Sequence, residues 1–291
     1  MFYTNPPKDF LRREYDAVII RDKFFDAYED VVYFGMPGPL MLDIQEWNDY
    51  LGFIIAVENK QESTGVMEMT AMSLGLNGKT QILQGDIESI LMNWEDDVGE
   101  IPAKEFFHVV NLDFEGGFLG LTDIIKQDKR TDAIRELFRH QKTQRQSFLF
   151  FLTVGFREKC EQEYDQKLHH IGEELAELGL DAKKTINWYL SRPKPYKLKV
   201  YIPYLMDEIG RTYRYFLTKY ICFYYQGTGG VPMMHFIFDF QYSMKSISPQ
   251  RQGLKSLLNA PLYIAYNDRV EPSPIQPLPL IGSIKNEHSI S

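Results

Sequence analysis

The chain has 291 residues, of which 44% are hydrophobic and 25% charged, so it is long enough to bury a sizeable core and is not of disordered composition. Its 40 acidic residues outnumber the 32 basic ones, and a net charge of −8 argues against a free-standing nucleic-acid binder, although a local basic face could still bind one. The two cysteines lack the spacing of zinc ligands, and we expect no metal site. The N-terminus is too polar for a secretory signal, and no apolar run approaches the roughly 20 residues of a membrane span, so we expect a cytoplasmic protein.

The first half of the chain alternates between apolar runs and helical patterns. Apolar residues at helical spacing over residues 7–30 predict one or two helices before the first strand. Four apolar runs that each end in a small or acidic residue then predict buried strands: Val31–Gly35, Phe53–Glu58, Gln81–Asp86 and Phe107–Asp113. A fifth apolar run, Ser147–Val154, follows a charged helical stretch. Strands that alternate with helices indicate a parallel sheet covered by helices.

The pattern changes after the fifth run. Residues 157–211 carry helical patterns, and within them the segment Arg192–Lys199 predicts a basic, proline-broken connection. Its Tyr196 could stack on a nucleic-acid base, or the segment could be a plain linker. Two long apolar runs, Arg214–Tyr225 and Met233–Tyr242, are joined by a Gly-rich turn and predict an antiparallel hairpin.

The expected organisation therefore has three parts. Residues 1–29 form an N-terminal helical segment, and residues 30–243 form one α/β domain with a helical insertion at about 157–211. Residues 244–291 are rich in Ser, Pro, Asn and Gln, which predicts an extended or disordered tail.

Five parallel strands with helices, closed by an antiparallel hairpin, resemble the class I S-adenosylmethionine-dependent methyltransferases. The resemblance covers residues 30–243 and implies a Rossmann-like, seven-stranded, mostly parallel sheet with a C-terminal antiparallel hairpin and helices on both faces. It also implies S-adenosyl-L-methionine as the cofactor. In that family a Gly-rich turn after strand 1 approaches the methionine part of the cofactor, and an acidic residue ending strand 2 bonds the ribose. A residue after strand 3 contacts the adenine, and the loop after strand 4 faces the methyl acceptor.

The resemblance assigns site residues position by position. It implies cofactor binding by the residues that follow the first four strands: Gly35, Met36, Pro37, Gly38, Glu58, Asn59, Asp86, Ile87 and Asp113. On the acceptor side it implies catalytic roles for Asn111, Asp113 and Glu115, because an amine or hydroxyl acceptor must be aligned and must lose a proton.

Several of these residues also have ordinary structural explanations. Gly35 and Gly38 could form a plain strand–helix turn, and Asp86 could serve as a helix N-cap alone. The first strand departs from the family pattern because no carboxylate precedes its turn, and Asp43 in the next helix is the candidate to compensate. Basic residues over 126–145 alternate with acidic ones, which favours a solvated helix with ion pairs over a nucleic-acid path.

The sequence leaves the function open among several classes. A nucleic-acid base amine is one expected acceptor, suggested by the sequence NLDFEGG and by Arg192–Lys199; a small molecule or a protein is the alternative. A non-catalytic interaction module with the methyltransferase fold is a further alternative. A nicotinamide-dependent oxidoreductase is less favoured because GMPGPL lacks the GxGxxG pattern. The sequence leaves the oligomeric state open and indicates no membrane partner.

Overall fold

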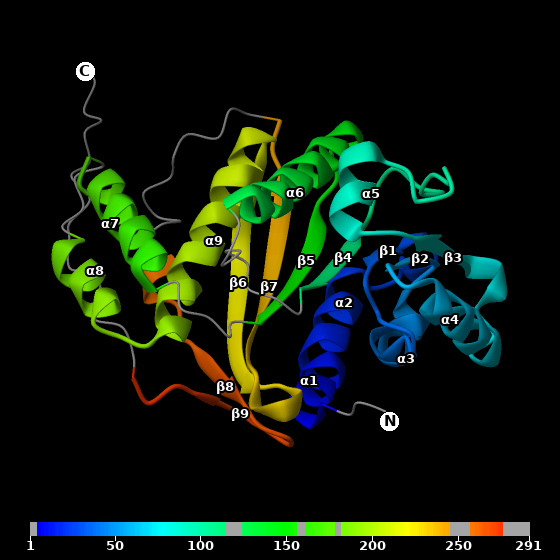
Figure 1. Ribbon diagram of the computed structural model, residues 1–291, viewed down its shortest axis with the longest axis horizontal. Helices are drawn as coiled ribbons and strands as arrows, with labels where there is room; N and C mark the ends of the chain where they lie inside the picture. Colours follow the sequence, from blue (N-terminus) through cyan, green and yellow to red (C-terminus); the bar gives the residue numbers. More distant parts are fainter. Residues whose placement is uncertain (1–4, 115–123, 156–160, 178–181, 245–256, 276–291) are drawn as a thin grey trace.

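The computed structural model describes residues 5–114, 124–155, 161–177, 182–244 and 257–275 (Figure 1). These residues form a nine-stranded sheet in the order β3-β2-β1-β4-β5-β7-β6-β8-β9. The strands are β1 Val32–Gly35, β2 Phe53–Glu58, β3 Thr80–Gln84, β4 Val109–Phe114, β5 Phe148–Gly155, β6 Tyr215–Gln226, β7 Pro232–Tyr242, β8 Tyr263–Ala265 and β9 Val270–Pro272.

The directions of the first seven strands agree with the resemblance to class I methyltransferases. Strands β1 to β5 pair in parallel, and β7 pairs antiparallel with both β5 and β6. Strand β6 therefore runs with the first five, and β7 is inserted between β5 and β6 as the antiparallel strand. The chain has the class I methyltransferase fold, with the crossover from β3 to β4 that creates a switch point between β1 and β4.

The expected number of seven strands is wrong. The outer edge of β6 is also paired, because Phe223 and Tyr224 align in parallel with Tyr263 and Ile264 of β8. Strand β9 then pairs antiparallel with β8. Both added strands lie within residues 244–291, for which the composition predicts an extended tail, and they cover an edge that would otherwise expose unpaired backbone groups.

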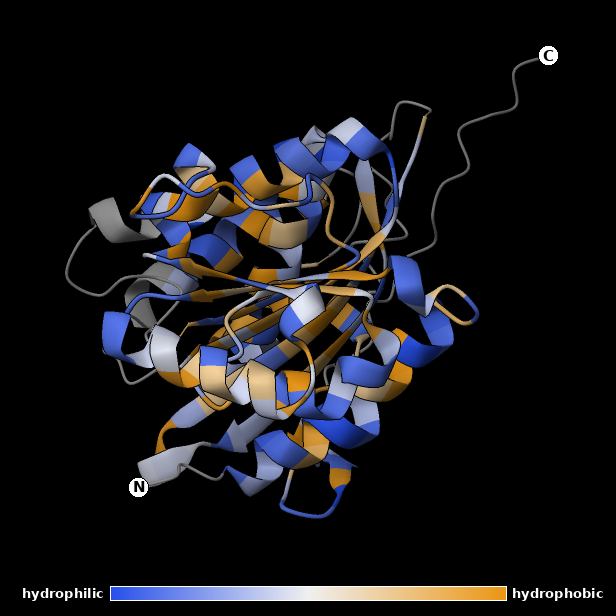
Figure 2. Cartoon of the chain, turned by 90° about the vertical axis from the view of Figure 1, so that its right-hand side faces the viewer, coloured by the Kyte–Doolittle hydropathy of each residue, from blue (hydrophilic) through white to orange (hydrophobic). Residues whose placement is uncertain are grey.

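Helices cover both faces of the sheet. They are α1 Pro6–Leu11, α2 Ala17–Lys23, α3 Leu42–Trp47, α4 Gln61–Ser73, α5 Ile87–Asn93, α6 Ile124–Gln144, α7 Glu161–Glu177, α8 Lys183–Leu190 and α9 Lys194–Thr212. Helices α1 to α4 contribute to one buried cluster, which contains Leu11 and Trp47, whereas α5 to α9 contribute to the other, which contains Phe138 and Ile202. Figure 2 shows the predominantly hydrophobic central strands between these two layers.

The segment Arg192–Lys199 is not the proline-broken connection that the sequence suggests. Helix α9 begins at Lys194, with Pro193 as its N-cap and Pro195 in its first turn, where a missing N–H costs no helical hydrogen bond. Lys194, Lys197 and Lys199 are buried, and the Tyr196 hydroxyl lies 2.5 Å from Ser273 Oγ. This segment therefore forms no exposed basic path, and Tyr196 is not placed to stack on a base.

Candidate active site

A cavity of about 690 Å³ opens at the carboxyl edge of the sheet, beside the switch point between β1 and β4. Open α/β sheets bind their ligands at this position. The cavity is lined by residues that follow β1, β2, β3 and β4, and these include most of the residues that the sequence assigns to the cofactor: Met36, Pro37, Gly38, Glu58, Asn59, Asp86, Ile87 and Asp113. Residues far apart in the sequence are thus brought together as predicted.

The two glycines of the first turn have different roles. Gly38 has a φ of +69° with open space around its α-carbon, and it lines the cavity. Gly35 does not line the cavity; a Cβ there would lie 2.3 Å from the carbonyl oxygen of Asn111 on the neighbouring strand. The Met36 N–H donates to that same carbonyl at 3.0 Å. Gly35 is therefore required by the close approach of β1 and β4, whereas Gly38 forms the wall of the cavity.

Glu58 is the last residue of β2, and its carboxylate is held at the cavity. Its Oε1 accepts a hydrogen bond of 3.0 Å from the backbone N–H of Lys60. Within the described part of the chain, Oε2 accepts no hydrogen bond. One oxygen orients the side chain, and the other is left for a ligand.

Asp86 caps helix α5, as its position after β3 predicts. Its Oδ2 accepts from the Ser89 N–H at 3.2 Å and from the Ser89 hydroxyl at 2.9 Å, and it pairs with Lys129 at 2.7 Å. Partial burial raises the pKa of Asp86, but the hydrogen bonds from Lys129 and Ser89 outweigh it and lower the pKa below its ordinary value. All three bonds go to Oδ2, and among the described residues none goes to Oδ1. N-capping is thus confirmed, and Asp86 lines the cavity with Oδ1 not engaged by any described residue.

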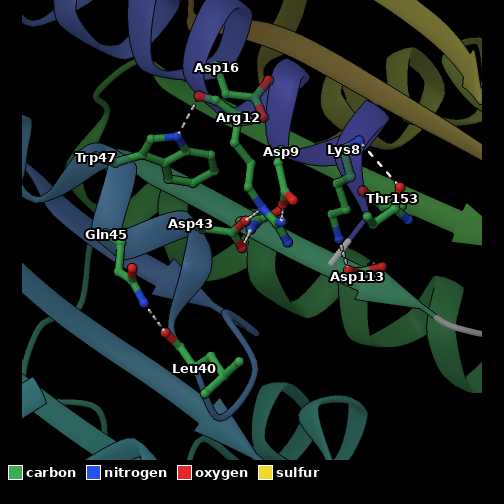
Figure 3. A network of polar contacts seen from close by, with 12 residues as sticks. Lys8, Asp9, Arg12, Asp16, Leu40, Asp43, Gln45, Trp47, Asp113 and Thr153 are labelled. Carbon is green, nitrogen blue, oxygen red and sulfur yellow. Dashed lines mark hydrogen bonds and ion pairs between the residues drawn. The ribbon is translucent and has the colours of Figure 1, made fainter. Parts of the chain in front are cut away.

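The acceptor-side residues after β4 are placed differently from one another. Asp113 lines the cavity and forms an ion pair with Lys8 of helix α1 (Figure 3). Asn111 is buried and does not line the cavity; its Nδ2 donates to Asp43 Oδ2 at 2.7 Å and to the Tyr33 hydroxyl at 3.4 Å. Glu115 lies outside the described residues.

Asp43 does not replace the carboxylate that strand β1 lacks. It is only 2% exposed, and its two oxygens are used by Asn111 and by Arg12, which also pairs with Asp9 at 2.5 Å. Arg12 in turn lines the cavity. Burial lowers the pKa of Arg12, but Asp43 and Asp9 outweigh this and raise it, so the guanidinium stays charged. Asp43 therefore holds a cation at the cavity wall.

Lys8 and Arg12 were missed by the sequence analysis, which treats the N-terminal segment as an apolar helix. The available signal is their spacing of four residues, which places two cations on one face of a helix. The π-helical turn Arg12–Asp16 connects α1 to α2 and is itself fixed from both sides. Arg12 accepts a hydrogen bond on its carbonyl from Trp47 Nε1 at 2.9 Å, and Asp16 Oδ1 lies 3.0 Å from His235 Nε2.

His235 completes a buried chain of three polar groups. Its Nδ1 lies 2.9 Å from Thr153 Oγ1, so Asp16, His235 and Thr153 follow one another as in a nucleophile triad. All three side chains are buried, and none lines the cavity. This chain of polar groups therefore anchors the N-terminal helices to strands β5 and β7.

The basic residues of helix α6 are largely paired with carboxylates. Arg130 pairs with Glu88 at 2.5 Å, Arg135 with Asp132 at 2.9 Å, and Arg139 with Glu136 at 2.5 Å. This confirms the predicted ion-paired helix for these residues. Over the described ranges, no group of three or more His, Cys, Asp or Glu side chains has a metal-site arrangement, and no helix is both long and apolar enough to cross a membrane.

One protein-family model matches this sequence. Its description is PP_RS20740-like, and it covers residues 6–189, which include the N-terminal helices and the first five strands. No curated protein matches the sequence.

Solved structures with a similar arrangement are distant in sequence. They include a candidate RNA methyltransferase from Pyrococcus horikoshii, at 9% identity over 80% of this chain and 82% of the other, with a TM-score of 0.43. An O-methyltransferase from Bacillus cereus in complex with SAH has 10% identity over 81% of each chain and a TM-score of 0.42. The O-methyltransferase TomG from Streptomyces achromogenes in complex with SAM has 10% identity over 80% and 88%, with a TM-score of 0.41. With TM-scores below 0.5, these likenesses do not bear on the activity of this chain.

Proposed function

We propose that this chain, which belongs to the PP_RS20740-like family, is an S-adenosylmethionine-dependent methyltransferase. The observation that carries the proposal is the cavity at the switch point. It gathers Gly38, Glu58, Asp86 and Asp113 from the ends of four successive strands. These are the positions at which the methyltransferase fold holds its cofactor.

The residues present fit that cofactor. A cavity of about 690 Å³ lies within the range of sites for molecules of this size. Glu58, with one oxygen available, would accept the ribose hydroxyls, and Asp86 Oδ1 would accept the adenine amino group beside Ile87. The turn Met36–Gly38 and the Arg12 guanidinium would face the amino-acid end, where a charged donor suits a carboxylate.

When bound, S-adenosylmethionine supplies a methyl group on a positively charged sulfur. The contribution of the protein is to orient the acceptor and to receive its proton. Asp113 is the carboxylate at the cavity on the acceptor side, and Lys8 fixes its orientation. Asn111 acts as a positioning residue, since its carbonyl and amide hold Met36 and Asp43 in place. We retain Glu115 as a second acceptor-side candidate.

A non-catalytic, ligand-binding member of the fold is the second candidate. The observation that favours it is the ion pair between Lys8 and Asp113, which already occupies the carboxylate proposed to serve the acceptor. Calorimetry shows whether the protein binds S-adenosylmethionine. A transfer assay with labelled cofactor and pools of RNA, protein and small molecules distinguishes a methyltransferase from a non-catalytic binding protein. A labelled product excludes the non-catalytic alternative.

The cofactor proposal is tested by titrating the protein with S-adenosylmethionine in a calorimeter. Glu58→Ala is expected to weaken binding roughly tenfold or more, because hydrogen bonds to a charged group contribute about 1.5–3 kcal/mol each. Glu68→Ala is the matched control, since Glu68 is exposed on α4 and does not line the cavity. Absence of binding by the unmodified protein, or equal affinities for the two variants, would overturn the proposal.

A further inference from the structure

A second cavity, of about 370 Å³, lies at the same edge of the sheet as the first. Strands β6 and β8 run in the same direction as β1 to β5, so their carboxyl ends reach this edge too. The cavity lies among the end of β6, the turn that follows it, the residues around the end of β8, and the start of helix α1. Figure 1 shows α1 beside the ends of β6 and β8. We call this cavity the β6–β8 groove.

The N-terminal segment Pro6–Arg12, which is helix α1 and the residue after it, contributes to the walls of both cavities. Pro6 and Pro7 line the β6–β8 groove, and Arg12, just beyond the end of the helix, lines the larger cavity. Between them, Lys8 pairs with Asp113, which lines the larger cavity. The acceptor-side carboxylate is thus held by the element that separates the groove from the proposed cofactor site.

The β6–β8 groove differs from the larger cavity in its chemistry. Among the described residues that line it, none has an ionised side chain. Its polar groups are the amides of Asn5, Gln226 and Asn267, together with the hydroxyls of Thr228 and three tyrosines. Amides and hydroxyls both donate and accept hydrogen bonds, and tyrosine rings offer flat apolar surfaces. A charged ligand would lose its hydration here without gaining an ion pair from the lining.

One tyrosine of this lining has a hydroxyl that finds no partner among the described residues. Tyr225 is 1% exposed, and its OH makes no hydrogen bond with any described residue. Burial raises the pKa of Tyr225, Asp113 raises it further, Arg12 lowers it, and Asp43 and Asp16 also raise it. A buried hydroxyl without a partner is costly and calls for a ligand or a bound water to satisfy it.

We propose that the β6–β8 groove is a second binding site, and that its ligand is a small, uncharged, planar molecule that hydrogen-bonds to the Tyr225 hydroxyl. The volume suits one or two rings and not a polymer segment. This second site does not depend on the proposed function, because binding in the groove can be measured without the cofactor.

The test uses 4-hydroxybenzamide as the neutral probe and 4-hydroxybenzoate as its charged counterpart, with binding followed by saturation-transfer NMR on the full chain. The neutral probe is expected to bind at least about threefold more tightly than the charged one. Tyr225→Phe is expected to weaken the neutral probe roughly three- to tenfold, the loss of one hydrogen bond. Asn267→Ala, at the exposed rim, provides a second variant that does not disturb the core.

Tyr215→Phe is the matched control. Tyr215 lies at the other end of strand β6, is buried, and also has a hydroxyl without a partner among the described residues, but it lines neither cavity. It should leave probe binding unchanged. The inference is overturned if the charged probe or a short single-stranded RNA binds more tightly than the neutral probe, or if the two Tyr→Phe variants behave alike.

The experiment separates this inference from the proposed function. Probe binding that depends on Tyr225, in a protein that fails to bind S-adenosylmethionine, supports the groove and overturns the methyltransferase proposal. Cofactor binding without probe binding overturns the groove alone.

Discussion

The two cavities at the carboxyl edge of the sheet differ in how they are built. The cavity beside β1 and β4 is lined by charged side chains held in ion pairs, such as Arg12 with Asp43 and Lys8 with Asp113. The β6–β8 groove is lined by aromatic rings, amides and hydroxyls. Charged walls suit a zwitterionic, sulfonium-bearing ligand, and uncharged walls suit a neutral one. One edge of a single sheet thus presents two chemically distinct surfaces, with helix α1 between them.

The largest expected effect is the loss of stability when a buried charge at the first cavity is removed. Arg12→Met should reduce the free energy of unfolding by about 3–5 kcal/mol, because Asp43 would remain as a buried carboxylate without its cation. Chemical denaturation measures this change. Adding Asp43→Asn to the variant should recover part of the loss, since it removes the unpaired charge.

Arg13→Met is the control for that experiment. Arg13 is exposed and pairs with its neighbour Glu14, and such an exposed pair contributes little to stability. If Arg12→Met costs no more than Arg13→Met, the first cavity does not depend on buried ion pairs, and the contrast with the groove is lost.

A smaller effect is expected at Asp86. Asp86→Ala should reduce the free energy of unfolding by about 1 kcal/mol at neutral pH, because the variant removes the N-cap of α5. Since the pKa of Asp86 is lowered in the folded protein, its stabilisation is present above the ordinary pKa of about 3.9. It is lost as pH falls through the lowered value.

Denaturation of both proteins between neutral pH and pH 3 checks this pH dependence. The difference between wild type and Asp86→Ala should shrink below about pH 4. A difference that grows on acidification would contradict the assigned partners, Lys129 and Ser89.

The first cavity contains the site residues that the sequence could predict. Glu58 and Asp86 follow apolar runs directly, so local pattern alone places them at strand ends, and parallel strands then bring those ends together. Strand β2 was predicted with the bounds that the structure shows. These features depend on residues close to one another in the chain.

The features of the fold and site that the sequence could not predict depend on contacts between distant segments. Lys8 reaches Asp113 across 105 positions, and β8 pairs with β6 through residues about 40 positions apart, so neither contact has a local signal. The lysines of α9 are buried although their sequence appears basic and broken, because long side chains can bury their methylenes when their amino groups find partners such as Asp165 and Tyr189. The groove and its uncharged lining arise from these distant contacts alone.

The smallest expected effect concerns the two tyrosines at opposite ends of β6. Tyr225→Phe and Tyr215→Phe each remove a buried hydroxyl that has no partner among the described residues, so neither should reduce the free energy of unfolding by more than about 0.5 kcal/mol. Removal of an unsatisfied polar group can even stabilise a fold. A loss above about 1 kcal/mol for Tyr225→Phe alone would show that its hydroxyl is already satisfied within the protein. In that case the hydroxyl would not be available to a ligand, and the groove would differ from the first cavity only in lacking charge.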